Sequence, residues 1–212
     1  MLSIAAMSPA AFNAPLSAVR SSVPAIRMQE AATPEAPPPF NPVTFAKTLP
    51  GITDPLGFFD PIGFIGEDTS EGKVRFYREV ELKHGRVAML ASLGFLVGEQ
   101  FHPLFGGSID VPSYIAFQET PLQTFWPAVV MVISIAEVFS VFSFNSPFGG
   151  EPWTIRSDHE AGDLGFDPLG MKPQSAGELK EMQTKELNNG RLAMVAIAGM
   201  IGQELATGSK LL

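Results

Sequence analysis

The chain contains no cysteine, and this absence excludes disulfides, thiolate metal sites and a cysteine nucleophile. Charged residues make up only 17% of the 212 residues, against about 25% in ordinary soluble domains, whereas 45% are hydrophobic. With a formal net charge of -8, nucleic acid is not an expected partner. The chain also lacks a phosphate-binding glycine loop, a nucleophile elbow and a metalloprotease motif, so an enzyme is not expected.

Acidic residues are missing from the start of the chain. Residues 1–39 contain none before Glu30, but they include Arg20, Arg27 and many Ala, Ser and Pro residues. This composition is typical of an organelle transit peptide, although a merely disordered tail has a similar one. Residues 32–39 are rich in proline and predict an extended linker. We therefore expect 1–39 to be a targeting and linker segment.

Long uncharged runs are scarce, and the clearest one lies in the middle of the chain. Residues 125–144 carry a single charge, Glu137, with Trp126 at one end as an interfacial anchor. Pro127 falls in the first turn, where proline is tolerated. We therefore predict a membrane-spanning helix over about 122–144.

Two stretches on either side of this run are near-copies of each other, ELKHGRVAM at 81–89 and ELNNGRLAM at 186–194. No proline interrupts the polar and apolar residues around either copy. The pattern predicts helices over about 71–100 and 175–206, each about 45 Å long at 1.5 Å per residue. Because this length exceeds the hydrocarbon thickness, the polar half should protrude or the helix should tilt.

Three spans with the copies first and third give both copies the same orientation. We expect an all-α membrane protein with three transmembrane helices, the first and third crossed about a pseudo-two-fold axis. Glu81 would then pair with Arg191, and Arg86 with Glu186, because side chains lean toward the helix N-terminus. Removing one partner of such a pair leaves an uncompensated charge. Lys83, by contrast, is not expected to neutralise a buried acid.

Small residues recur along both predicted helices, which allows close packing or leaves room for flat ligands. His84 and Asn189 lie one turn after the two glutamates and, like them, can donate a lone pair to a metal. These groups are scattered singly, so no multidentate ion site is expected. Single ligands suit a metal already held by a macrocycle, such as chlorophyll magnesium.

The paired ExxHGR and ExxNGR motifs, the Asp-Pro loops at Asp60 and Asp167 and the acid of the middle helix resemble the chlorophyll-binding light-harvesting antenna proteins. The resemblance covers about residues 50–207. The segments ELKHGRVAML and GQELATG are more similar to the chlorophyll a/c antennas of red-lineage algae than to plant antennas. The segment HPLFGG that begins at His102 is most similar to the branch associated with photosystem I.

The resemblance implies a role for each of these residues. The magnesium ligands would be Glu81, His84, Glu137, Glu186, Asn189 and Gln203. Asp60 and Asp167 would lie near the ends of two carotenoids. The chain departs from the family pattern at two positions. Ser140 replaces an arginine of plant antennas, so Glu137 lacks its usual partner. Val129 replaces a glutamine of some relatives, so a pigment there is expected to be absent. His102, Gln118 and His159 are expected to be surface or solvated groups.

The function implied is a pigment scaffold that absorbs light and passes excitation to a photosystem. Residues 40–212 would hold chlorophyll a, chlorophyll c and xanthophyll carotenoids. The partners would be a photosystem core, neighbouring antenna subunits and thylakoid lipids, in the plastid thylakoid membrane. A photoprotective relative that dissipates excitation is an alternative. A small transporter or proton channel is a more distant one, since the charges pair across an axis rather than along a pore.

Overall fold

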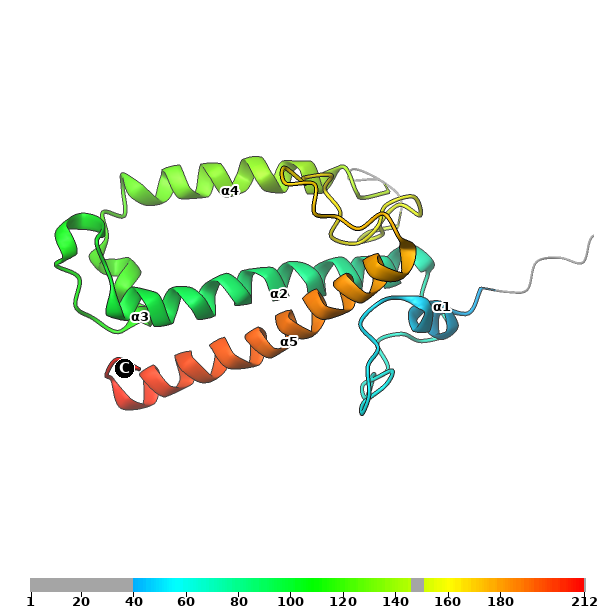
Figure 1. Ribbon diagram of the computed structural model, residues 1–212, viewed down its shortest axis with the longest axis horizontal. Coiled ribbons are helices and arrows are strands. Elements are labelled where there is room, and N and C mark those ends of the chain that lie inside the picture. The colour runs from blue at the N-terminus through cyan, green and yellow to red at the C-terminus, as the bar shows by residue number, and fades with distance from the viewer. Residues whose placement is uncertain (1–39, 146–150, 212) are drawn as a thin grey trace, which may run out of the picture. The chain divides into compact units, whose positions relative to one another are not determined.

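A computed structural model describes residues 40–145 and 151–211. The expected targeting and linker segment 1–39 lies outside the described residues. The described parts form helices and loops with two isolated β-bridges (Figure 1). In chain order the elements are α1 (Pro42–Thr48), α2 (Glu71–Gln100), the 3-10 turn η1 (Leu104–Gly107), α3 (Ser113–Ala116), the 3-10 turn η2 (Phe117–Glu119), α4 (Phe125–Val141) and α5 (Ala176–Thr207).

The two long helices, α2 and α5, lie close to the ranges expected from the repeated motifs. Each carries an acid in its first turn, Glu71 in α2 and Glu178 in α5, which is favourable near the positive end of the helix dipole. Helix α5 is capped by Gly208, which has a φ of 66° and donates its N–H to the carbonyl of Glu204. Glycine adopts this left-handed conformation without steric cost.

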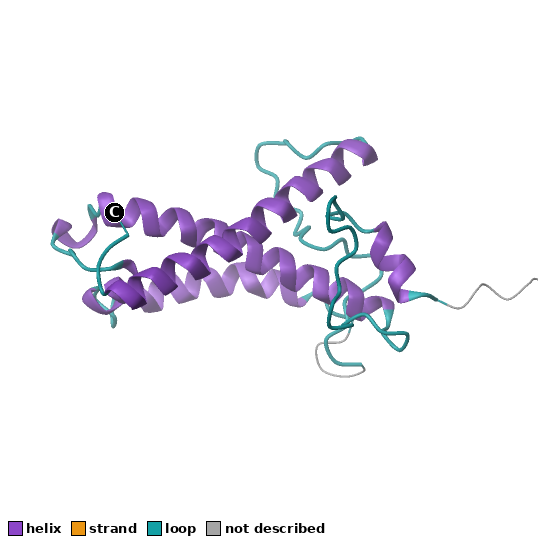
Figure 2. Cartoon of the chain, turned by 90° about the horizontal axis from the view of Figure 1, so that it is seen from below, coloured by secondary structure: helices purple, strands orange, loops and turns teal. Residues whose placement is uncertain are grey.

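Helices α2 and α5 lie side by side and cross (Figures 1 and 2). The glycines of the two motifs meet at the crossing, where a Cβ added to Gly85 would lie 3.0 Å from the Cα atom of Gly190, and the reverse is also true. Only glycine allows the two backbones to touch in this way. The residues buried beside the crossing are Leu82, Ala88, Leu187 and Ala193.

Helix α4 is shorter than the predicted range of about 122–144, with 17 residues. It ends at Val141 because the following backbone pairs with a second segment. Ser143 accepts a hydrogen bond from the N–H of Arg156 at 3.0 Å, and the N–H of Asn145 donates to the carbonyl of Thr154 at 3.0 Å. These bonds replace the helical ones that would continue α4.

Within residues 40–145 and 151–211, no helix combines the length and the apolar character that a bilayer-crossing segment requires. Helix α4 is apolar but short, whereas the longer helices α2 and α5 carry several charged residues. The expected count of three membrane-spanning helices is therefore not confirmed by this measure.

The described polypeptide buries few large apolar side chains of its own. Its buried hydrophobic residues are Ala46, Val74, Leu82, Ala88, Ile155, Leu187 and Ala193. Most large apolar side chains of α4 are exposed, including Val130, Met131, Val132, Ile133, Ile135, Val138 and Phe139. No Cα atom of α4 lies within 8 Å of a Cα atom of α2 or α5. Contiguous exposed apolar surface of this kind marks a face that contacts lipid, ligand or partner.

Candidate functional site

Two ion pairs join α2 and α5 on either side of the glycine crossing. Arg191 Nε donates to Glu81 Oε1 at 2.7 Å, and Arg86 Nε donates to Glu186 Oε1 at 2.7 Å. The structure therefore contains both pairs that the repeat suggests. All four side chains are half-buried, at 30–39% exposure. Each arginine belongs to one copy of the motif and neutralises the glutamate of the other.

Each arginine also binds a loop that precedes an Asp-Pro sequence. Arg191 donates through a second nitrogen to the carbonyl of Gly51 at 2.6 Å, and Arg86 donates to the carbonyl of Gly162 at 3.0 Å. The planar guanidinium can hold two acceptors at once, which lysine cannot do in the same geometry. The helix pair and the loops above it are thus fixed by the same two side chains.

The two halves differ around their glutamates. Arg78 donates to Glu81 Oε2 at 2.8 Å, so both oxygens of Glu81 accept a hydrogen bond. The corresponding position before Glu186 is Gln183, and Glu186 accepts bonds through one oxygen among the described residues. Neither oxygen of Glu81 is therefore free of hydrogen bonds, and a magnesium ion could be bound only through a remaining lone pair. The i,i+3 spacing of Arg78 and Glu81 is the sequence signal for this contact.

The neutral candidates are available for binding from outside. His84 is exposed, and its Nδ1 lies 2.8 Å from the carbonyl of Val80. When Nδ1 carries the proton for this bond, Nε2 presents a free lone pair, which is the tautomer that a metal ligand needs. Asn189 and Gln203 are exposed as well, and their side chains make no hydrogen bond with the described part of the chain.

Glu137 lacks the arginine that plant antennas have at the position of Ser140, but it has another cationic partner. Lys83 Nζ donates to Glu137 Oε2 at 2.5 Å and to Ser140 Oγ at 2.8 Å. The partner comes from α2 rather than from the next turn of α4, so no local spacing in the sequence reveals it. Lys83 therefore pairs with an acid, although this acid is not a buried one, because the Glu137 side chain is 57% exposed.

Asp60 and Asp167 organise the loops in which they lie. Asp60 accepts hydrogen bonds from the N–H groups of Gly63, Phe64 and Ile65 at 2.9–3.0 Å. Asp167 accepts from those of Met171 and Lys172 at 3.1 and 2.9 Å. These bonds, the strongest from Ile65 and Lys172 respectively, hold the pKa of each carboxyl below its ordinary value.

The hydrogen bonds that Asp60 accepts from its loop predict a pH dependence of stability that can be measured. The pKa of Asp60 is lower in the folded protein than in the unfolded chain. Ionised Asp60 therefore stabilises the folded protein fully above its ordinary pKa of about 3.9, and this contribution is lost as the pH falls through the lowered pKa of the folded state. Asp60→Asn is expected to lower the Tm at pH 7, and its difference from the wild type should shrink in strong acid. Asp68→Asn, an exposed change in the same loop, is the control. A Tm difference that is constant with pH would contradict this role.

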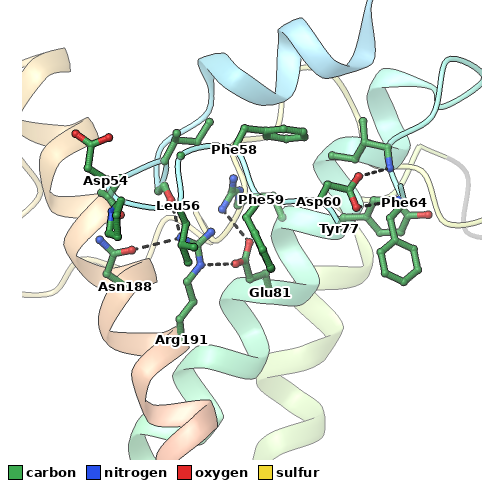
Figure 3. Close-up of a pocket in the computed structure, with 17 residues that line it drawn as sticks. Asp54, Leu56, Phe58, Phe59, Asp60, Phe64, Tyr77, Glu81, Asn188 and Arg191 are labelled. Atoms are coloured by element: carbon green, nitrogen blue, oxygen red, sulfur yellow. Dashed lines mark hydrogen bonds and ion pairs between the residues drawn. The ribbon is translucent and has the colours of Figure 1, made fainter. Parts of the chain in front are cut away.

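A cavity of about 600 Å³ opens beside each ion pair. The first lies between the 51–60 loop and the helices, with Glu81, Arg191 and Asp60 in its wall (Figure 3). The second cavity lies beneath residues 160–173. Its wall contains the counterparts of these three residues in the other half of the chain, namely Glu186, Arg86 and Asp167. Aromatic and aliphatic side chains such as Phe58, Phe59, Phe166 and Met171 complete the walls. Each cavity is mostly apolar with charged groups at one side.

A family model described as "Chlorophyll A-B binding protein" matches residues 45–205. The chain belongs to this chlorophyll-binding family. The family consists of helical membrane proteins, and the match includes both copies of the motif, the middle helix and both Asp-Pro loops.

Relatives of this family member include chloroplastic proteins of the algae Chlamydomonas reinhardtii and Isochrysis galbana. It is 49% identical to "Light-harvesting complex stress-related protein 1, chloroplastic" of Chlamydomonas reinhardtii, over 80% of this chain and 69% of the relative. It is 50% identical to stress-related protein 3.2 of the same alga, over 76% of this chain and 64% of the relative. A "Fucoxanthin-chlorophyll a-c binding protein, chloroplastic" of Isochrysis galbana is 43% identical, over 91% of this chain and 89% of the relative. The alignments thus span roughly two thirds of the stress-related relatives.

The residues of this family member fit chlorophyll as a ligand. Exposed nitrogen and oxygen atoms of His84, Asn189 and Gln203 stand beside apolar helix faces that the described polypeptide leaves uncovered. No group of three or more His, Asp or Glu residues among the described residues could hold a bare metal ion. Isolated ligands next to apolar surface match a metal that arrives within a macrocycle.

Sequence reasoning missed a buried glutamate beneath the second loop. Glu79 is 4% exposed and accepts a hydrogen bond from the N–H of Gly162 at 2.6 Å. His159 Nε2 lies 3.6 Å from the same carboxylate oxygen, so the expectation that His159 is solvated is wrong. The loop folds back over α2, and only this long-range packing buries the pair.

Two further glutamates, Glu99 and Glu204, lie near the C-terminal ends of α2 and α5. Glu204 is fully buried and accepts a hydrogen bond from the N–H of Tyr114 at 2.9 Å. Glu99 accepts from the hydroxyl of Ser113 at 3.3 Å. Both carboxylates therefore fasten α3 to the crossed pair. In the same connection Gln118 is exposed, as expected, whereas His102 is only half-exposed.

Proposed function

We propose that this chain is a light-harvesting antenna protein that binds chlorophylls and carotenoids and passes excitation energy to a photosystem. One observation carries the proposal: exposed single ligands lie beside helix faces that remain apolar and uncovered in the polypeptide alone. Pigments would cover these faces. The family membership and the names of the relatives support the same function.

The proposed magnesium ligands fall into two chemical groups. The neutral ligands are His84, Asn189 and Gln203. The carboxylate ligands are Glu81, Glu137 and Glu186, each of which has a lysine or arginine partner. Chlorophyll supplies light absorption through its macrocycle when bound. The protein fixes the separation and orientation of each ligand by placing it on a rigid helix, and Arg86 and Arg191 keep the carboxylates in place.

The two cavities are the proposed sites for the ends of two xanthophyll carotenoids. Each has apolar walls for a polyene chain and charged or amide groups for a polar end ring. Asp60 and Asp167 would act by shaping the loops, since their carboxylates are already occupied by backbone N–H groups. Chlorophyll a and chlorophyll c are the proposed macrocycles, in line with the fucoxanthin-chlorophyll a-c binding relative.

The proposed location is the thylakoid membrane of a plastid, which residues 1–39 would help the chain to reach. Helices α2, α4 and α5 would span the membrane together, with lipids and pigments on their apolar faces. The proposed partners are neighbouring antenna subunits and a photosystem core, with photosystem I favoured by the segment that begins at His102. The protein would be a scaffold without enzymatic activity.

Purification of the full chain from its native membrane tests this function. We expect chlorophylls and carotenoids to elute with the protein, and carotenoid bands to appear in the excitation spectrum of chlorophyll fluorescence. Co-purification with photosystem I rather than photosystem II would support the proposed partner. A colourless protein, or bound pigments without energy transfer, would refute the antenna function.

A photoprotective role is the second candidate, because two relatives are named as stress-related proteins and are 49% and 50% identical. The chlorophyll fluorescence lifetime of the purified complex separates the two roles. A harvesting antenna should keep a long lifetime between pH 7.5 and pH 5. A dissipating protein should show a lifetime that is short throughout or becomes short on acidification.

His84→Leu is expected to remove one chlorophyll per chain with little change in folding. The only hydrogen bond of the His84 ring in the described structure goes to the carbonyl of Val80, so its loss costs little. His84→Asn, which copies the second motif, should retain the pigment. Pigment extraction from complexes refolded with chlorophylls and carotenoids gives the stoichiometry. Equal chlorophyll content in all three proteins would show that His84 is not a ligand.

A further inference from the structure

Helix α4 stands apart from the crossed pair along its length. No Cα atom of α4 approaches α2 or α5 within 8 Å, although the helix runs beside α2 (Figure 1). One ion pair crosses the space between the two helices, from Lys83 Nζ on α2 to Glu137 Oε2 on α4. Ser140, which is 5% exposed, accepts a second hydrogen bond from the same Nζ at 2.8 Å.

The charge of Glu137 requires a partner from another helix. Helix α4 contains no lysine or arginine between Phe125 and Val141. Glu81 and Glu186 each have an arginine partner across the crossing. A chlorophyll is neutral overall, so a carboxylate ligand leaves a net negative charge in an apolar surrounding, where an unpaired charge is costly. Lys83 supplies the missing positive charge.

The repeat shows that Lys83 departs from the two-fold symmetry. Its counterpart in the second motif is Asn188, whose side-chain oxygen accepts a hydrogen bond from Arg191 at 3.3 Å beside the first cavity. No cation is required at Asn188, because the acid of α4 lies on the α2 side of the crossed pair and not on the α5 side (Figure 1). The lysine occurs in the copy that faces α4.

We propose that Lys83 is the positioning residue of the pigment site at Glu137. The inference rests on the proposed function. Lys83 holds Glu137 Oε2 and neutralises the carboxylate, which leaves Oε1 without a hydrogen bond from the described residues and free to bind magnesium. Through Ser140 it also fixes the turn of α4 that carries the ligand. Lys83 therefore replaces, from a different helix, a cation that α4 lacks.

Refolding of the full chain with chlorophylls and carotenoids tests this role. Lys83→Met should lose one chlorophyll per chain, and its absorption difference spectrum against wild type should match that of Glu137→Leu. Lys83→Arg should retain the pigment and the spectrum. Lys185→Met is the control, since Lys185 pairs with Glu181 on the exposed surface of the same helix, α5. A general loss of folding would remove all pigments instead of one spectral component.

A compensating variant makes the test independent of how well the single variant folds. Lys83→Met combined with Ser140→Arg places a cation one turn after Glu137 and should recover the missing chlorophyll. Failure to recover it overturns the role, as does an unchanged pigment content in Lys83→Met. A colourless wild type would instead refute the antenna function, so the two failures are distinguishable.

Discussion

Arg191→Leu is expected to abolish or strongly reduce assembly of the pigment complex. Among the described residues, the substitution leaves Glu81 with Arg78 as its remaining cationic partner, and it releases the carbonyl of Gly51. Removal of one partner of a buried ion pair destabilises a protein by about 3–5 kcal/mol, and the half-exposed pair here should approach that range when pigment and lipid cover it. The yield and Tm of refolded complex measure the effect.

The control for this prediction must be a cation that does not join two helices. Lys83 is unsuitable because it pairs with Glu137. Lys185→Leu removes a surface pair between side chains that are 70% and 66% exposed, which is worth about 0–1 kcal/mol. Similar yields from Arg191→Leu and Lys185→Leu would show that the crossing does not depend on the ion pair.

Gly190→Val is expected to prevent α2 and α5 from crossing at their observed distance. The first carbon of the new side chain would lie 3.0 Å from the Cα atom of Gly85, and backbone cannot move aside as a flexible side chain can. Overpacking typically costs about 1–3 kcal/mol, and separation of the helices would also strain both ion pairs. We expect a Tm lowered by several degrees or no stable complex.

The same substitution elsewhere in α5 provides the control. Gly177 lies in the first turn of the helix, where an added Cβ would meet only the hydroxyl of Ser175 at 3.9 Å. Gly177→Val should be neutral or slightly stabilising, because valine favours a helix more than glycine does. Equal stability of the two variants would contradict a crossing that requires glycine.

The long helices and the paired charges could be predicted because their signals are local or repeated. Continuous proline-free stretches predict α2 and α5, and the duplicated motif places each arginine opposite the other copy's glutamate. Contacts that join different parts of the chain could not be predicted in this way. Lys83 meets Glu137 only because of where α4 lies, and Glu79 is buried only because the loop at Gly162 folds over it.

The middle helix shows where composition misleads. Its apolar run extends past Val141 in the sequence, but the helix stops there because the next residues pair with the segment around Ile155. Hydropathy cannot detect this competition between helical and bridging hydrogen bonds. The membrane span proposed for α4 therefore depends on its setting beside α2, pigments and lipids rather than on the length of the helix alone.

The exposed apolar faces connect the fold to the function. Side chains such as Val132, Ile135 and Leu192 are more than half exposed, whereas the buried hydrophobic residues are only three alanines, two leucines, one valine and one isoleucine among the described residues. Burial of apolar surface is the main favourable contribution to folding. The polypeptide alone lacks much of that contribution, so bound pigments would supply the remainder of the core.

Circular dichroism during refolding tests this dependence most directly. The chain is unfolded in detergent and refolded with and without chlorophylls and carotenoids, while far-ultraviolet and visible signals are followed on heating. The account predicts a cooperative melt in which helical and pigment signals disappear together, and no cooperative melt without pigment. An equally helical and equally cooperative pigment-free chain would contradict it.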